Sequence, residues 1–331
     1  MWAYLVRRLL YYIPLYLCIL LVLMLLLRID VDSAVAGQLG KQATPEQIQL
    51  KKDKMGLNDP FYKQYAMFLG DVFTLSFDQR SWEQELPVGE MIRKALPPTL
   101  MITLPSLAFT AVISIAVGLV CSFNRGRFLD RGLMIAAVLG MSVSYLVYII
   151  IGQYFGAYVL GQQHGITPFE IEGYEAVFPP IEGSDGAWFV PGNWIKYCAL
   201  PVIIGVGVAM GYDTRFYRAV MVEECARDYI VTATAKGATS KKIMFVHMLK
   251  NAMIPIVTRI MISLPFLIAG SILVEMYFSI PGMGRTMITA INGKDFPVVQ
   301  ATVAVFAAFV IVTVILTDVC YAIVDPRVRL S

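Results

Sequence analysis

The chain has 331 residues, of which 57% are hydrophobic and only 15% are charged, with a formal net charge of +3. Soluble domains carry about 25% charged residues, so this composition excludes an ordinary soluble protein and indicates one embedded in a lipid bilayer. The small net charge gives no reason to expect nucleic acid as a partner. The five cysteines and two histidines are scattered, without the spacing of a metal site.

Six apolar runs are each long enough, or nearly so, for the roughly 20 residues that a helix needs to cross the hydrocarbon layer. Backbone N–H and C=O groups find no water there, so we expect each run to be helical and the protein to be all-α and polytopic. The fourth run is the shortest. The runs are Leu9–Leu27, Leu100–Phe123, Leu133–Leu160, Tyr197–Tyr212, Met253–Val274 and Val298–Ile323.

Segment 1–28 contains the first apolar run, which is longer than the core of a secretory signal, so we expect it to be retained as a span. The next segment, 29–97, is predicted to be external and partly helical. Thr44, with Pro45 and Gln47 behind it, is a capping signature for a helix that ends near Gly56. Residues 61–73 give a second amphipathic helix, predicted to lie on the membrane interface or cap the bundle, with substrate contact as the alternative.

Basic residues near the span ends predict the orientation of the protein, because they favour the cytoplasmic side. They gather in four segments that fall on one side of a six-span protein, while loop 163–196 on the opposite side is mostly acidic. Both termini, including tail 324–331, should therefore be cytoplasmic. The basic residues are Arg7, Arg8, Arg125, Arg127, Arg131, Arg215, Arg218, Arg227, Lys236, Lys241, Lys242, Lys250, Arg327 and Arg329.

The cytoplasmic loop 214–252 is too polar to cross a bilayer and too regular for a linker. Four residues follow the i, i+3, i+4, i+7 spacing of one helical face, which we expect a soluble partner to contact, with Tyr229 as an anchor. The alternative is a hairpin that only connects the fourth and fifth runs. The four residues are Ala226, Tyr229, Ile230 and Ala233.

Gly237 should end this first helix, because glycine adopts the positive φ of a helix end without a Cβ clash. Thr239 or Ser240 should then cap a second helix that leads into the fifth run.

Two ionisable residues fall within apolar runs, where a charge is costly. Arg259 is expected either to reach the interface or to pair with an internal acid, and a place on the translocation path is the alternative. Asp318 is expected to pack within the bundle rather than to relay protons.

A further set of residues in and after the cytoplasmic loop matches a known pattern: Arg218, Glu223, Asp228, Tyr229, Thr232, Ala233, Ala235, Lys236, Gly237, Asn251, Ala252, Ile254 and Pro255. The segment resembles the cytoplasmic "EAA" loop of ATP-binding-cassette import permeases of the dipeptide, oligopeptide and nickel group. The likeness covers nearly the whole chain. It includes Arg7-Arg8-Leu9-Leu10, Phe278-Ser279-Ile280-Pro281-Gly282-Met283-Gly284 and Asp325-Pro326-Arg327. Val231, Thr234 and Arg227 depart from the family pattern.

This resemblance implies a type I importer permease of the first-subunit type in the bacterial inner membrane, with six transmembrane helices. One lies within residues 1–28, and the others form a permease core over 98–323 that also holds the coupling-helix loop. The resemblance also implies that the loop docks on a separate ATPase subunit. The implied coupling residues are Glu223, Ala226, Asp228, Tyr229, Thr232, Ala233, Ala235, Lys236 and Gly237.

The implied partners are a second homologous permease, two ATPase subunits, an external solute-binding protein and membrane lipid, with no nucleic acid. The phosphate-binding pattern G-x-x-x-x-G-K-[ST] does not occur in the sequence, so ATP must be hydrolysed by partners and the chain is expected to be neither an enzyme nor a cofactor protein.

The resemblance gives peptides as the first substrate, with a nickel chelate or another small solute as the alternative. An ion-coupled secondary transporter would need a cluster of acids among the spans. A membrane enzyme would need a nucleophile–base pair or metal-ligand spacing, and the sequence shows neither.

Overall fold

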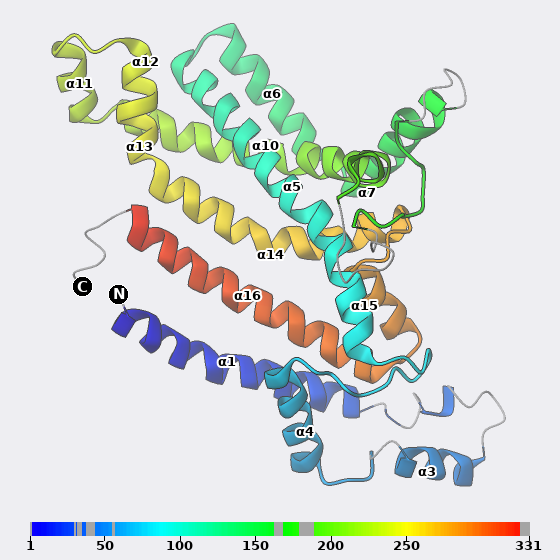
Figure 1. Ribbon diagram of the computed structural model, residues 1–331. Helices are drawn as coiled ribbons and strands as arrows, with labels where there is room; N and C mark the ends of the chain where they lie inside the picture. The colour runs from blue at the N-terminus through cyan, green and yellow to red at the C-terminus, as the bar shows by residue number, and fades with distance from the viewer. Residues whose placement is uncertain are drawn as a thin grey trace. The chain divides into compact units, whose positions relative to one another are not determined.

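The computed structural model describes residues 2–29, 31, 35–37, 44–54, 57–161, 168–178 and 189–324. Within these residues the chain forms helices, turns and one isolated β-bridge between Arg80 and Pro87, which confirms the all-α expectation (Figure 1). The chain divides into two compact units. One comprises Met1–Thr99 and Pro281–Ile315, and the other comprises Leu100–Ile280 and Leu316–Ser331.

The described part of the first unit includes four labelled helices and parts of two longer ones that also extend into the second unit. They are α1 (Trp2–Arg28), α3 (Pro45–Lys54), α4 (Phe61–Thr74), α15 (Met283–Asn292), the beginning of α5 (Val88–Phe123) and most of α16 (Phe296–Val324).

The second unit holds the rest of α5 and α16 and all helices between residues 128 and 277. They are α6 (Phe128–Ser142), α7 (Tyr145–Ile151), η1 (Gly152–Val159), α9 (Pro191–Asn193), η2 (Trp194–Ala199), α10 (Leu200–Cys225), α11 (Asp228–Ala235), α12 (Ser240–Lys242), η3 (Ile243–Met248), α13 (Leu249–Asn251) and α14 (Met253–Tyr277).

By length and composition, four of the described helical stretches can cross a membrane: Leu10–Arg28, Val88–Phe123, Pro191–Cys225 and Phe296–Cys320. Two further pairs of helices pass the same test only together, because each is bent at a short break. The total is six if each bent pair is one span, as the sequence predicts.

The third apolar run is not the continuous helix that we expected. It forms α6 and α7–η1, which meet at 96° across the extended residues Val143 and Ser144. The Tyr148 hydroxyl donates to the carbonyl of Gly140 at 2.8 Å, so a carbonyl that the break would free is satisfied. Hydropathy did not reveal this break, since the residues around it are neither Pro nor strongly polar.

The fourth run is longer than expected and the fifth begins with a bend. One helical stretch continues from Pro191 to Cys225, well beyond the predicted end at Tyr212. Residues 240–251 and 253–265 meet at 58° around Ala252, where the predicted cytoplasmic loop joins α14.

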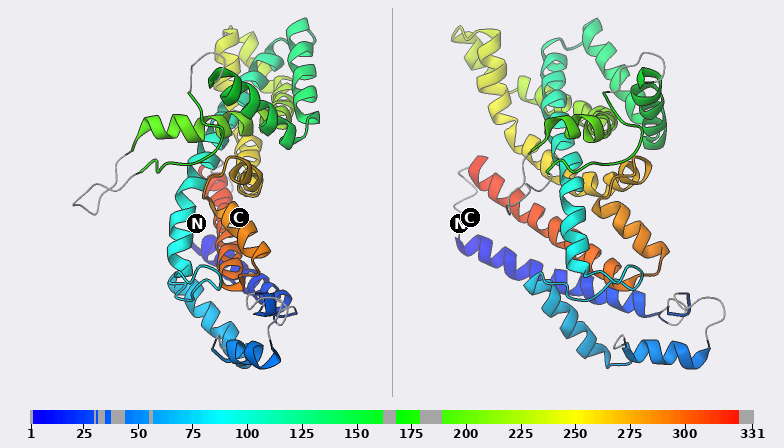
Figure 2. Two further views of the ribbon diagram at one scale, coloured as in Figure 1. Left: turned by 90° about the vertical axis from the view of Figure 1, so that its right-hand side faces the viewer. Right: turned by 45° about the vertical axis from the view of Figure 1, so that its right-hand side comes forward.

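Within the first unit, α1 and α16 lie side by side (Figures 1 and 2), and the Tyr16 hydroxyl donates to the carbonyl of Ala304 at 3.0 Å. α4 packs on α1, since the Tyr65 hydroxyl donates to the carbonyl of Leu17 at 2.8 Å. Phe68 of α4 is buried in the same apolar core. These contacts fix α4 against α1.

Both helices predicted in the external segment are present. At the start of α3, the Thr44 amide donates to the Gln47 side chain at 3.1 Å and the Gln47 amide donates to the Thr44 hydroxyl at 3.4 Å. This reciprocal capping box confirms the predicted start, whereas the predicted end at Gly56 lies outside the described residues. The second predicted helix is α4.

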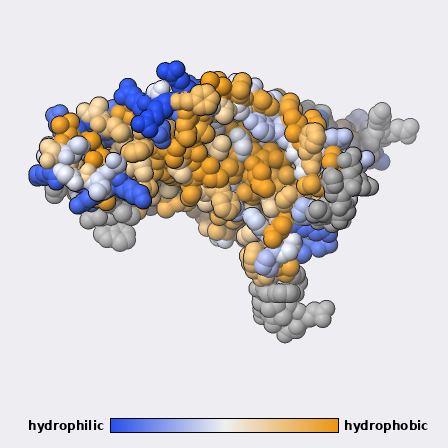
Figure 3. All heavy atoms as spheres, turned by 90° about the horizontal axis from the view of Figure 1, so that it is seen from above, coloured by the Kyte–Doolittle hydropathy of each residue, from blue (hydrophilic) through white to orange (hydrophobic). Residues whose placement is uncertain are grey.

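In the second unit, α10 crosses α6 at very short range because Gly211 has no side chain. A Cβ there would lie 2.6 Å from the carbonyl oxygen of Ala137. Many apolar side chains of the chain remain exposed, among them Val112 at 67% and Phe128 at 91%. Figure 3 shows apolar side chains spread over much of the visible face, with hydrophilic side chains in separate patches. Such a surface is suited to lipid or to partner subunits.

Candidate functional site

The loop that the sequence predicts to be cytoplasmic folds as a short helix, a turn and a second helical segment. α11 begins after the extended residue Arg227, and Asp228 lies in its first turn, where the helix dipole favours an acid. Gly237 has φ +75° and follows the end of α11, as predicted. The Lys242 amide donates to the Thr239 hydroxyl at 3.4 Å, so Thr239 rather than Ser240 is the cap.

The face of α11 that we expected a partner to contact is largely turned inward. Ile230 and Ala233 are each only 8% exposed, and Ile230 packs with Tyr217 and Met248 in a core that also includes α5 and α14. The expectation of an open docking face is therefore wrong for these two residues. The apolar spacing was correct, but the chain itself covers the face.

Tyr229 also faces its own chain rather than projecting as a free anchor. It is partly buried against the same core, and its hydroxyl donates to the carboxylate of Glu224. Burial, followed by this hydrogen bond, raises the pKa of Tyr229 to about 12, so the hydroxyl remains a donor at neutral pH.

The opposite side of α11 is open. Asp228, Val231, Thr232 and Ala235 are exposed, and they follow the same i, i+3, i+4, i+7 spacing. We call these four residues the outward face of α11. Val231 is an apolar side chain that is 65% exposed, so it is available for contact with a covering surface.

The remaining predicted coupling residues lie at the two ends of α11. Lys236 and Gly237 are exposed at its end. Glu223 and Ala226 are exposed where α10 ends, and Arg227 donates to the Glu223 carboxylate at 2.7 Å. The structure thus brings all nine predicted residues together in one short region, although not on one face.

A largely buried ion pair supports the C-terminal half of α10. Arg218 donates from Nε to Asp130 Oδ1 at 2.6 Å and from Nη2 to Asp130 Oδ2 at 2.7 Å. The Gly126 amide also donates to Asp130, whose side chain is 3% exposed. The sequence indicated Arg218 but not its partner, and the only available signal was a single acid among the arginines after the second run.

A second ion pair confirms that Arg259 pairs internally. Arg259 Nε donates to Asp213 Oδ1 at 2.8 Å. We missed Asp213 because the predicted fourth span ended one residue before it. The pair lines a cavity of 260 Å³ within the second unit.

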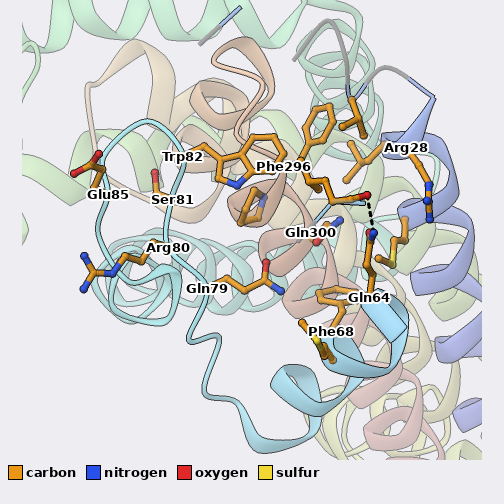
Figure 4. Close-up of a pocket in the computed structure, with 16 residues that line it drawn as sticks. Arg28, Gln64, Phe68, Gln79, Arg80, Ser81, Trp82, Glu85, Phe296 and Gln300 are labelled. Carbon is orange, nitrogen blue, oxygen red and sulfur yellow. Dashed lines mark hydrogen bonds between the residues drawn. The ribbon is translucent and has the colours of Figure 1, made fainter. Parts of the chain in front are cut away.

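The first unit contains a larger pocket of 680 Å³ beside the end of α1 and the start of α16 (Figure 4). Figure 4 shows Arg28 and Arg80 on opposite sides of it, with the rings of Trp82 and Phe296 between them at a centroid distance of 5.3 Å. No group of three or more His, Cys, Asp or Glu residues that could hold a metal ion occurs in the described part of the chain.

Comparison with known proteins identifies the family. Residues 114–330 match the family described as binding-protein-dependent transport system inner membrane component, and residues 1–103 match the N-terminal family of the same transport systems. The chain is 32% identical over 288 residues to the dipeptide transport system permease protein DppB of Lactococcus lactis, covering 87% of each chain.

Two further relatives match over almost the entire length. The glutathione transport system permease protein GsiC of Escherichia coli is 31% identical over 329 residues, with 98% of each chain covered. The dipeptide transport system permease protein DppB of Alkalihalophilus pseudofirmus is 29% identical, with 99% of this chain and 100% of that chain covered. The chain therefore belongs to the family of inner-membrane permease components of binding-protein-dependent transport systems.

Proposed function

We propose that this chain is one of two permease subunits of an ATP-driven importer for short peptides. A second homologous permease would complete the pore, two ATPase subunits would drive it and an external solute-binding protein would deliver the peptide. The relatives named for dipeptide and glutathione transport support the substrate class, and they do not favour the nickel-chelate alternative. The absence of a phosphate-binding motif from the sequence supports separate ATPase subunits.

The outward face of α11 is proposed as the surface that the ATPase grips. The observation that carries this proposal is that α11 is buried on one side only. One side is packed into the chain's own core, and the opposite side, including Val231, is open. A helix built in this way can pass a displacement of its partner into α5, α10 and α14, which is what alternating access requires.

The loop would then lie in the cytoplasm together with both termini, in a multi-pass protein of the bacterial inner membrane. The asymmetric distribution of Lys and Arg supports this orientation.

The experiment is ATP-dependent peptide uptake by the complete importer in proteoliposomes, with Val231→Arg as the test variant. The large charged side chain should prevent the ATPase from seating, so co-purification of the ATPases and uptake should both be lost. Thr234→Arg is the matched control, because Thr234 is an exposed α11 residue outside the outward face. Normal ATPase retention and uptake by Val231→Arg would refute the docking assignment.

A further inference from the structure

The 260 Å³ cavity in the second unit is lined by residues of α5, α7, α10 and α14. These helices belong to stretches that can cross a membrane by length and composition. The lining is mostly apolar, but it includes several residues with polar groups: Thr110, Tyr145, Tyr212, Asp213, Arg259 and Ser263. Ionisable side chains among membrane helices are costly, and they usually mark a pathway or a partner.

The ion pair in this cavity leaves part of the arginine available. Only Nε of Arg259 engages Asp213, and the Arg259 side chain is 33% exposed whereas that of Asp213 is 6% exposed. Among the described residues, no hydrogen-bond acceptor contacts the two terminal nitrogens of Arg259. Arg218, in contrast, uses two nitrogens to close a pair with Asp130. Arg259 is thus held in place by one nitrogen and retains two for an anion.

A buried hydroxyl group in the lining also lacks a partner. Thr110 is 2% exposed, and within the described residues its hydroxyl makes no hydrogen bond. Ser106 and Ser114 lie one turn away on the same face of α5. Within the described residues their hydroxyl groups are also buried and make no hydrogen bond. Leaving a buried hydroxyl unpaired costs about 1–3 kcal/mol, so this part of α5 carries a costly row of unsatisfied polar groups next to the cavity.

The size and chemistry of the cavity limit the ligand. Pockets for whole small molecules usually measure about 300–1,000 Å³, so 260 Å³ suits one end of a short peptide rather than all of it. The terminal nitrogens of an arginine match a carboxylate, which they bind through two parallel hydrogen bonds.

We propose that this cavity binds the carboxylate end of the transported peptide during its passage, with Arg259 as the binding residue and Asp213 as the residue that positions it. The inference rests on the peptide-import function proposed above. Asp213 also balances the charge of Arg259 when the cavity is empty, which lowers the cost of keeping an arginine among apolar helices.

The test compares two peptides that differ only in a free or an amidated C-terminus. Uptake by the complete importer in proteoliposomes is measured at matched concentrations of loaded binding protein, after the affinity of that protein for each peptide has been determined. The wild type should transport the free acid faster. Arg259→Gln should remove this preference, slowing the free acid by about tenfold or more relative to the amide, because one charge-assisted interaction is lost.

A double variant controls for misfolding caused by an unpaired buried charge. Asp213→Asn with Arg259→Gln leaves two neutral amides that can hydrogen-bond, with no unpaired buried charge, and it should show the same selective loss for the free acid. Equal slowing of both peptides would make the pair purely structural and overturn the proposal, as would an unchanged preference for the acid. A wild-type importer that moves neither peptide would refute the import function itself, before any variant is compared.

Discussion

Arg218 and Asp130 form a two-pronged ion pair, with Nε–Oδ1 and Nη2–Oδ2 distances of 2.6 and 2.7 Å. The pair ties the start of α6 to the C-terminal half of α10, the helix that leads directly into α11. Gly118 allows α5 to approach the same part of α10, because a Cβ there would lie 3.1 Å from the Arg218 amide nitrogen. The support of α11 therefore depends on charge geometry as well as on apolar packing.

Replacing Arg218 with Lys should destabilise the permease although the charge is kept. A lysine is a point donor and cannot reproduce two parallel hydrogen bonds to one carboxylate. We expect a loss of about 1–3 kcal/mol, seen as a lower unfolding midpoint in detergent. Arg227→Lys is the matched control, since its pair with Glu223 is exposed on both sides and should contribute little. Equal midpoints for both variants would contradict the structural role of the Arg218 pair.

Gly237→Pro should abolish ATP-driven uptake while membrane insertion continues. The residue has φ +75°, whereas proline is restricted to about −65°, so the turn after α11 cannot form. Gly237→Ala provides a graded comparison, because alanine tolerates this conformation at a cost of about 1 kcal/mol. Uptake and ATPase co-purification by the proline variant report on the turn, and immunoblots of membranes report on insertion. Retention of the ATPases by Gly237→Pro would count against this turn as part of the coupling region.

Tyr229→Ala should also abolish ATP-driven uptake, since it removes a ring that packs α11 against its own core. Tyr229→Phe keeps the ring and removes only the hydroxyl that donates to Glu224, so it should retain most of the uptake. The pair of variants separates packing from hydrogen bonding. If the alanine variant assembles and transports normally, α11 does not need this anchor.

Features that depend on a few neighbouring residues were predictable from the sequence. The capping box at Thr44, the positive φ of Gly237 and the cap at Thr239 all arise from interactions within a few residues. Apolar periodicity also found the correct stripe of α11. It did not show whether this apolar face is covered by the chain itself or by another protein, because both kinds of face have the same composition.

Features that depend on distant residues were missed. Asp130 and Arg218 are 88 positions apart, and Asp213 and Arg259 are 46 positions apart, so neither pair leaves a local pattern. Asp213 was further concealed by the rule that a charge ends an apolar run, although a paired acid can continue a membrane helix. The break at Val143 and Ser144 depends on tertiary contacts such as that of Tyr148, which hydropathy does not contain.

The loop before α5 should collapse when Asp295 is replaced by Ala. Asp295 accepts hydrogen bonds from the Ser81 hydroxyl and from the amides of Trp82, at 3.1 Å, and Glu83, at 3.4 Å. The same loop contains Leu75, Phe77 and Glu85 with positive φ, a conformation that side chains disfavour and that needs support from its surroundings.

The loss of these hydrogen bonds should cost about 2–4 kcal/mol, since several charge-assisted bonds to one buried carboxylate are lost together. Trp82 lines the pocket of the first unit, so its fluorescence should shift to longer wavelength as the loop opens to water. Asp295→Asn keeps one acceptor oxygen and should shift less. Asp59→Ala is the control, because its pair with Lys63 is solvent-exposed and lies outside this network. Unchanged Trp82 emission in Asp295→Ala would show that the loop is held by its other contacts, in particular the backbone bonds between Ser81 and Leu86 and between Val88 and Gln79.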